Sequence, residues 1–276
     1  MANVAAQMQE KLKIREHYFE NGYYFPIDAI PADMARDAAA RYRRLIETPP
    51  KGINHPWAIK THLLADWVFE LTTHPAVLDA VEVVIGPNIL MQAADTFIKP
   101  ARNEKIVNWH QDANYWGLQP FELVTAWIAL SDVTPQNGCM RYLPGSHRQA
   151  KVEHIETFAA NSALTRGQEI ALEIDEAVTV DVALTPGQIS LHHCLLAHAS
   201  GPNTTDNARI GLAVRYLSTH VRQTEGPPMS AILVRGHDAY DHFQSDPAPT
   251  GAFTAETIAA HAAAMTPHKV SGYATA

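Results

Sequence analysis

Cysteine is scarce in this sequence, which has only Cys139 and Cys194 among its 276 residues. Two cysteines without framework spacing exclude the multi-disulfide scaffold of small secreted domains, so we expect both to be reduced thiols. The first residues, Met1 to Lys13, also lack the apolar segment of a signal peptide. Both absences favour a cytoplasmic protein.

Long apolar runs and an excess of positive charge are also missing. No apolar stretch approaches the roughly 18 residues that a membrane span requires. The chain has 21 Lys and Arg against 29 Asp and Glu, a formal net charge of -8. Nucleic acids and anionic membranes bind basic patches, so the acidic balance argues against both as partners. The 46% of hydrophobic residues is enough for a sizeable core.

The first third of the chain has helical periodicity. Apolar spacing predicts helices over 7–20, 32–47 and 63–85, the last one broken near His74-Pro75. Asn21-Gly22 and the Pro-rich run 49–52 provide stop signals after the first two helices. A short strand is expected over 23–27.

After residue 88 the sequence changes to short segments rich in β-formers, separated by Pro, Gly and Asn turns. Strands are expected over 89–99, 107–112, 123–130, 140–143, 178–182, 188–192 and 210–217. Extended loops over 221–251 and a helix over 253–265 should follow. Helices before many short strands indicate an α+β fold with a double-stranded β-helix core, a cupin-like jelly roll. We expect one domain over 1–276, with a helical part at about 1–88, the jelly-roll core at about 89–220 and a C-terminal extension over 221–276.

The most informative segment is Asn108-Trp109-His110-Gln111-Asp112. Side chains two residues apart in a strand leave the same face, so His110 and Asp112 could both bind one metal ion. A core histidine beside a turn-capping aspartate would explain the same pair without a metal.

A downstream segment supplies further candidate ligands, His192, His193 and His198, and Arg209 follows it. Two histidines and one carboxylate form the facial arrangement that holds iron(II) and leaves positions open for oxygen and a co-substrate. A bidentate 2-oxo acid brings a second carboxylate, and the planar fork of an arginine pairs with such a group. Arg209 suits this role, although a surface strand position would explain it as well.

Together these segments resemble the phytanoyl-CoA dioxygenase family of iron(II)/2-oxoglutarate-dependent oxygenases, over about Tyr23 to Leu217. The matching pieces are Trp109-His-Gln-Asp112 with Tyr115-Trp116, Thr125-Ala-Trp-Ile-Ala-Leu130, Gly138-Cys-Met-Arg-Tyr-Leu-Pro-Gly-Ser-His147, and Leu191-His-His-Cys-Leu-Leu-Ala-His198-Ala-Ser-Gly-Pro-Asn203 followed by Arg209. The set in this order is far more specific than any one piece.

The resemblance implies that His110, Asp112 and His198 bind Fe(II), and that these three residues and Arg209 form the catalytic set. His192 and His193 do not match the ligand position, and we interpret one of them as a group behind the ligands or in the core. Relatives that chlorinate have Ala or Gly in place of the carboxylate ligand. Because this chain has Asp112, hydroxylation or another oxidative outcome is expected.

The resemblance also implies 2-oxoglutarate as co-substrate, with O2 as the second one. Arg209 and Ser200 would bind the distal carboxylate of 2-oxoglutarate. Trp127 would line its pocket, and Gln92 would contact its 1-carboxylate end.

Substrate contacts are expected from five residues: Lys60, Trp57, Tyr115, Trp116 and Arg141. Each has a structural alternative, such as core packing for the aromatic residues or solvation for Lys60. Arg215 has the same strand parity as Arg209, so if it faces the interior it needs an anionic partner. Asp95 and Glu122 are both candidates for that partner.

The family implied by the resemblance acts on acyl-CoA thioesters, amino acids, aminoalkylphosphonates and secondary metabolites. No basic tract suited to the phosphates of CoA is visible, so we expect a small polar substrate with an aliphatic C–H bond to oxidise. A cupin-like metal- or ligand-binding protein without oxygenase activity is one alternative, and a zinc hydrolase is another. Neither alternative gives a reason for Asp112, Ser200 and Arg209 together. The oligomeric state stays open.

Overall fold

The computed structural model describes residues 2–50, 59–157, 162 and 168–270. The helices are α1 Ala2–Asn21, α2 Ala32–Glu47, α3 Asp66–Thr72, α4 Pro75–Ile85, α5 Ala113–Trp116 and α6 Ala255–Val270. The strands are β1 Tyr23–Asp28, β2 Ile89–Lys99, β3 Val107–His110, β4 Leu118–Gln119, β5 Leu123–Ala129, β6 Met140–Tyr142, β7 His154–Glu156, β8 Gln168–Ile170, β9 Val180–Val182, β10 Gln188–His193, β11 His198–Ser200, β12 Arg209–Ser218, β13 Arg222–Gln223, β14 Ser230–Arg235 and β15 Gln244–Ser245.

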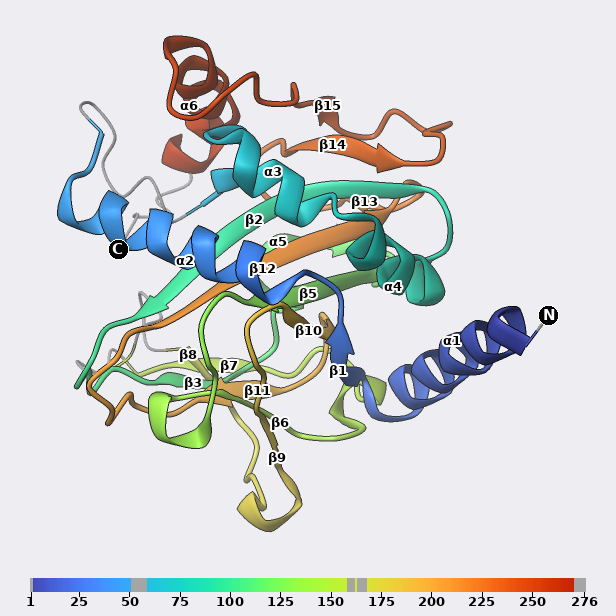
Figure 1. The fold of residues 1–276 in the computed structure, drawn as a ribbon. Coiled ribbons are helices and arrows are strands. Elements are labelled where there is room, and N and C mark those ends of the chain that lie inside the picture. The colour runs from blue at the N-terminus through green and yellow to red at the C-terminus, as the bar shows by residue number, and fades with distance from the viewer. Residues whose placement is uncertain (1, 51–58, 158–161, 163–167, 271–276) are drawn as a thin grey trace.

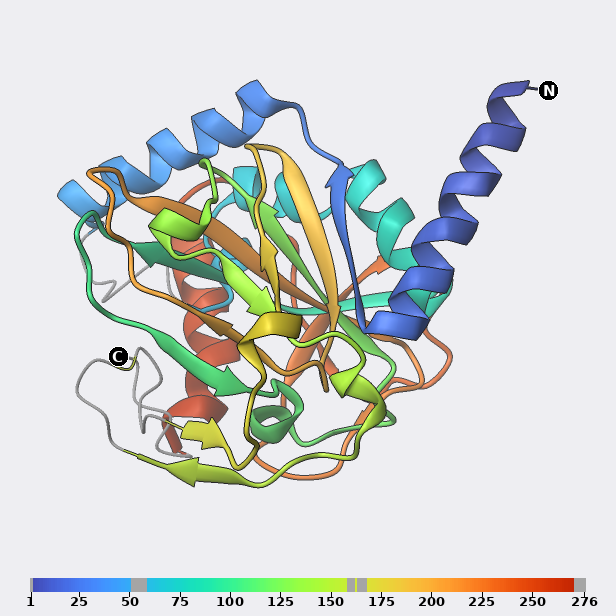
Figure 2. The ribbon, with the colours of Figure 1, turned by 90° about the horizontal axis from the view of Figure 1, so that it is seen from below.

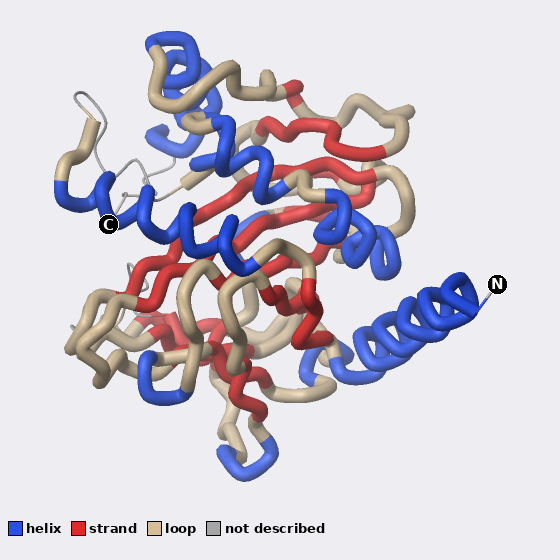
Figure 3. The backbone as a smooth tube through the Cα atoms, viewed as in Figure 1, coloured by secondary structure: helices blue, strands red, loops and turns tan. Residues whose placement is uncertain are grey.

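Two sheets form the core (Figures 1 and 3). The larger sheet has the strand order β1-β10-β5-β12-β2-β14-β15, and the smaller one has the order β3-β11-β6-β9. Trp127 and Ala129 of the larger sheet pack against Met140, Tyr142 and Val182 of the smaller one, so the two sheets face each other. The predicted α+β fold with a jelly-roll core is confirmed.

Strand alternation separates the two faces of the larger sheet. On β12, Ile210, Leu212, Val214 and Tyr216 are buried in the main apolar core together with residues of α2, α3 and α4. These helices lie over that face of the sheet in Figure 1, and Figure 2 shows the smaller sheet on the opposite side. Because neighbouring side chains point to opposite faces, the odd-numbered residues of β12 point toward the smaller sheet. Arg209 and Arg215 therefore both belong to the inner face.

Sequence signals account for the bounds of α2 and for the start of α4. α2 buries Ala35, Ala38, Ala39 and Tyr42, the one-sided spacing of a helix that lies on a sheet. α4 has Pro75 in its first turn, where the missing N–H costs no hydrogen bond. The break predicted near His74 thus separates α3 from α4.

Three local expectations need correction. The strand expected over 107–112 ends at His110, because Asp112 has helical backbone angles and begins the short helix α5. The first helix begins at Ala2 and not at residue 7. The region 221–251, expected to be loops, contains β14, which pairs with β2 and extends the larger sheet.

Two absences noted in the sequence can be compared with the structure. Cys139 and Cys194 are both free and buried, which confirms them as unpaired thiols. Within the described ranges, no helix is both long enough and apolar enough to cross a membrane.

Candidate metal centre and co-substrate site

The three predicted metal ligands lie together between the two sheets. His110 on β3 and His198 on β11 are directly paired across neighbouring strands, and their ring centroids are 4.1 Å apart. The Oδ1 atom of Asp112 lies 3.6 Å from Nε2 of His110 and 3.8 Å from Nε2 of His198. Donor atoms bound to one metal at about 2.1 Å lie roughly 3 to 4.2 Å apart, depending on the angle between the bonds. The group therefore fits one metal ion.

The two histidines have the tautomer that metal binding requires. Nδ1 of His110 lies 2.8 Å from the Asn108 carbonyl oxygen, and Nδ1 of His198 lies 3.0 Å from the Leu196 carbonyl oxygen. A carbonyl oxygen only accepts, so each Nδ1 has the proton and each Nε2 offers a lone pair. Burial, together with the nearby His110, lowers the pKa of His198 to about 3. The His198 ring is therefore neutral near pH 7.

Asp112 provides the single negative charge of the group. Burial opposes its ionisation, but the surrounding imidazoles of His198, His110 and His192 hold the pKa of the carboxyl well below its usual range. The sequence predicted that Asp112 lies beside His110 because both belong to one strand, and this explanation is wrong. The chain turns into α5 immediately after β3, and that turn directs the carboxylate back toward the histidines.

A second polar group lies on the inner face where β12 begins. Arg209 is only 4% exposed, and its Nη1 donates to the Gly138 carbonyl oxygen at 2.7 Å. Its Nε atom is buried and has no hydrogen-bond partner among the described residues. The guanidinium carbon lies 5.3 Å from the centroid of the Trp127 ring, and burial lowers the pKa of Arg209 to about 10. The predicted neighbours Arg209, Trp127 and Ser200 are thus brought together, since the Ser200 hydroxyl donates to the same Gly138 oxygen at 2.9 Å.

Lys99 is a further member of this group that the sequence argument missed. It pairs directly with Arg209 across β2 and β12, and its ammonium donates to Oγ of Ser200 at 2.7 Å. Burial and the charge of Arg209 lower its pKa to about 7. Among the described residues, no carboxylate forms an ion pair with either cation. Lys99 could be recognised only from its position opposite Arg209 in the β2–β12 pair. That position follows from the register of the sheet, which the sequence does not show.

Gln92 and Arg215 lie farther along the same two strands. The register of β2 against β12 shifts between Arg215 and Tyr216, so Gln92 is the extra residue of a bulge. The bulge turns its amide oxygen toward Nη1 of Arg215, which donates to it. The two possible partners of Arg215 are now distinguished, because Asp95 lies 3.8 Å from Nη2 and Glu122 pairs with His220. Gln92 therefore contacts Arg215, whereas Arg209 lies at the other end of β12.

Aromatic residues of α5 stand beside these groups. The guanidinium carbon of Arg215 lies 3.6 Å from the centroid of the Trp116 ring. The Tyr115 ring lies 6.2 Å from the ring of His110. Tyr115 therefore lies close to the metal group, and Trp116 lies against Arg215.

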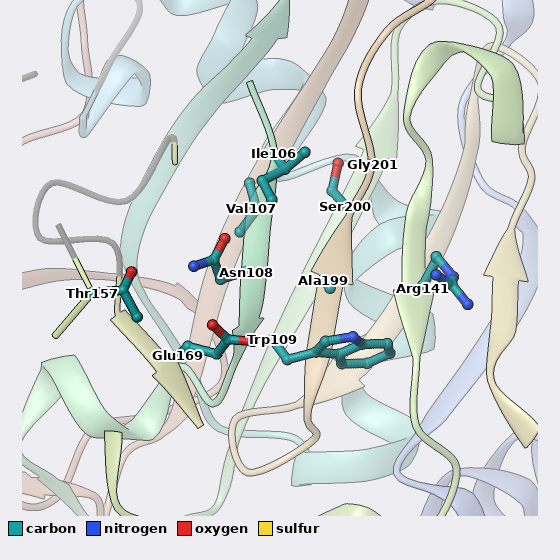
Figure 4. Close-up of a pocket in the computed structure, with 10 residues that line it drawn as sticks. All are labelled: Ile106, Val107, Asn108, Trp109, Arg141, Thr157, Glu169, Ala199, Ser200 and Gly201. Carbon is teal, nitrogen blue, oxygen red and sulfur yellow. The ribbon is translucent and has the colours of Figure 1, made fainter. Parts of the chain in front are cut away.

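Two other predicted substrate residues, Lys60 and Arg141, are not brought to this group. The ammonium of Lys60 is fully buried and donates to Asp246 and Ser230 at 2.7 and 2.8 Å. Arg141 lies on the outward face of the smaller sheet, because its neighbour Tyr142 points inward with His198. It pairs with Glu176 there and, with Trp109, lines an outer cavity of about 360 Å³ (Figure 4). Trp57 lies outside the described residues.

Comparison with known proteins supports the same class of site. Residues 18–211 match the family model for phytanoyl-CoA dioxygenase (PhyH). A solved non-heme monooxygenase, ThoJ in its apo form, is 36% identical with a TM-score of 0.83, and the match covers 93% of this chain and 96% of ThoJ.

Two curated relatives give shorter matches. A probable phytanoyl-CoA dioxygenase of Caenorhabditis elegans is 29% identical over 157 residues, 54% of this chain and 50% of that protein. A probable alpha-ketoglutarate-dependent hypophosphite dioxygenase of Stutzerimonas stutzeri is 29% identical over 158 residues, 56% of this chain and 54% of that protein. The chain thus spans about half the length of the curated relatives it matches.

His110, Asp112 and His198 have the residue types of a facial iron site with two histidines and one carboxylate. The chain belongs to the phytanoyl-CoA dioxygenase family.

Proposed function

We propose that the protein is an iron(II)- and 2-oxoglutarate-dependent dioxygenase that hydroxylates an aliphatic C–H bond of a small polar substrate. Candidate substrates are amino acid-like, aminophosphonate-like or secondary-metabolite molecules. Oxidation of 2-oxoglutarate would release succinate and CO2. His110, Asp112 and His198 would hold the metal.

The observation that carries the proposal is the pair of buried cations near the metal group. Arg209 and Lys99 are 4% and 5% exposed, and Nε of Arg209 has no partner in the part of the chain that the structure describes. Buried charge is costly unless an opposite charge compensates it, so this place favours an anion. The distal carboxylate of 2-oxoglutarate would accept hydrogen bonds from Arg209 and Lys99, with Trp127 alongside its carbon chain. The other end of the molecule would then face the metal.

In this scheme, the protein residues bind and orient the metal ion and 2-oxoglutarate. When bound, iron(II) supplies the activation of oxygen, which no side chain provides. His198, His110 and the ionised Asp112 would give the metal three donors on one side and would leave its other side accessible. A halide would need the place that Asp112 fills, which favours hydroxylation.

The inner face beyond the metal group supports a polar substrate. There, Arg215 donates a hydrogen bond to Gln92, forms an ion pair with Asp95 at 3.8 Å and is stacked on Trp116. Charged side chains at such a place suit a substrate with polar or ionised groups and not a purely aliphatic one.

Anaerobic titration tests the proposal against a cupin-like binding protein and against a zinc hydrolase. The iron(II)-loaded protein should develop a visible absorption band on addition of 2-oxoglutarate, and Asp112→Ala should not. Oxygenated samples should then form succinate. A wild-type protein that binds iron(II) but gives neither the band nor succinate would contradict the assignment.

A further inference from the structure

A fourth histidine touches the metal group without belonging to it. His192 lies on β10 opposite Thr125 of β5, and both side chains are on the inner face of the larger sheet. Nε2 of His192 lies 3.5 Å from Oδ2 of Asp112, and Oγ1 of Thr125 lies 3.4 Å from the same oxygen. The two candidate metal-binding histidines approach the other oxygen, Oδ1. The two carboxylate oxygens therefore have different neighbours.

The hydrogen-bond chain behind His192 allows its ring proton to lie on Nε2. Nδ1 of His192 lies 3.0 Å from the Tyr142 hydroxyl, which lies 2.9 Å from Oγ of Ser190. All three side chains are at most 2% exposed, so no bulk water competes. If Tyr142 donates to Nδ1, then Nε2 has a proton to donate to Asp112. The opposite tautomer would direct a lone pair at a carboxylate, which is repulsive.

We propose that His192 is a positioning residue that holds Oδ2 of Asp112, so that only Oδ1 is offered to the metal. The inference rests on the proposed metal centre. A carboxylate that used both oxygens would occupy a second coordination position, which the co-substrate or oxygen needs. Groups behind the ligands that fix ligand orientation in this way tune metal affinity.

The adjacent histidine shows that this arrangement is particular to position 192. Nδ1 of His193 accepts a hydrogen bond from the backbone N–H of Leu195 at 3.0 Å, within the turn that leads to β11. That bond shapes the loop. Of the two neighbouring histidines, His192 is the one whose ring lies beside His198, with centroids 4.9 Å apart.

Metal affinity tests the inference separately from activity. Calorimetric titration with iron(II) under anaerobic conditions should show about 10- to 100-fold weaker binding for His192→Phe than for the wild type. His192→Gln should retain the affinity, because its amide nitrogen can replace Nε2 as the donor to Asp112. His62→Phe is the matched control. His62 is equally buried, and within the described ranges neither of its ring nitrogens has a hydrogen-bond partner, so its loss should leave the affinity unchanged.

Tyr142→Phe provides a second route that removes a single oxygen atom. It should weaken iron(II) binding on the order of two- to tenfold, the value of one hydrogen bond. Thermal melting of each apo variant shows whether it is folded, and Tyr142→Phe decides the matter if His192→Phe is not. If a folded His192→Phe binds iron(II) as tightly as the wild type, the inference is overturned. If His192→Phe does not fold, wild-type affinity in Tyr142→Phe overturns it. A wild-type protein that binds no iron(II) would instead overturn the proposed function.

Discussion

Replacement of Lys99 by Met should change stability and co-substrate affinity in opposite directions. The side chain is 5% exposed, and its pKa of about 7 in place of 10.5 means that the fold disfavours the ammonium. At about 1.4 kcal/mol per pKa unit, this cost is roughly 4 kcal/mol at neutral pH. The hydrogen bonds to Ser200 and Gly201 offset about 1 to 1.5 kcal/mol each.

A Met side chain has a similar volume but no charge, so Lys99→Met removes the cost of burying the ammonium and also removes those two hydrogen bonds. We therefore expect Lys99→Met to raise the free energy of unfolding of the apo protein by about 1 to 2 kcal/mol. In the proposed binding mode, the same change removes one charge-assisted hydrogen bond to 2-oxoglutarate, worth about 1.5 to 3 kcal/mol. The dissociation constant for 2-oxoglutarate should rise by about 10- to 100-fold.

Two measurements check this prediction. Urea denaturation gives the free energy of unfolding, and anaerobic titration of the iron(II) protein with 2-oxoglutarate gives the dissociation constant from the visible absorbance. Lys105→Met serves as the control, because Lys105 is an exposed lysine in the loop after β2. A Lys99→Met protein that is less stable and binds 2-oxoglutarate as tightly as the wild type would refute the reasoning.

Three further predictions follow from particular contacts. Because Lys99 loses its proton as pH rises through about 7, 2-oxoglutarate binding should weaken over that range in the wild type and not in Lys99→Met. Lys60→Met should reduce the free energy of unfolding in urea by about 3 to 5 kcal/mol, since it leaves Asp246 buried and unpaired, and Lys60→Met/Asp246→Leu should restore most of it. Gly211→Ala should cost about 1 to 3 kcal/mol and weaken 2-oxoglutarate binding, because the added methyl group overlaps the Trp127 ring. Unchanged stability in either single variant, or flat binding across pH, would contradict the corresponding contact.

The sequence indicated the fold because hydrophobic periodicity decides which elements form. The strand over 89–99 and the helix over 32–47 have the bounds expected from their patterns. The missed strand β14 lies between Pro-rich turns and is only six residues long. Its place is determined by pairing with β2, a long-range contact that a local pattern does not contain.

The site shows the same division between local and long-range information. The order of the motifs was enough to predict His110, Asp112 and His198 as metal ligands, and the structure groups these three residues together. The roles of Lys99 and His192 depend on sheet register, because each is placed opposite its partner by a neighbouring strand. Arg141 shows the converse, since it lies within a matching motif but one residue away from the inward-facing parity.

Succinate formation from 2-oxoglutarate tests the central claim most directly. The purified protein would be supplied with iron(II), oxygen and ascorbate, and assayed across a panel of small amino acid-like and phosphonate-like compounds. We expect at least one compound to raise succinate formation above the basal rate in the wild type, with formation of its hydroxylated product. Asp112→Ala should abolish both signals. Equal succinate formation by Asp112→Ala, or none by an iron-loaded wild type, would contradict the assignment of this site.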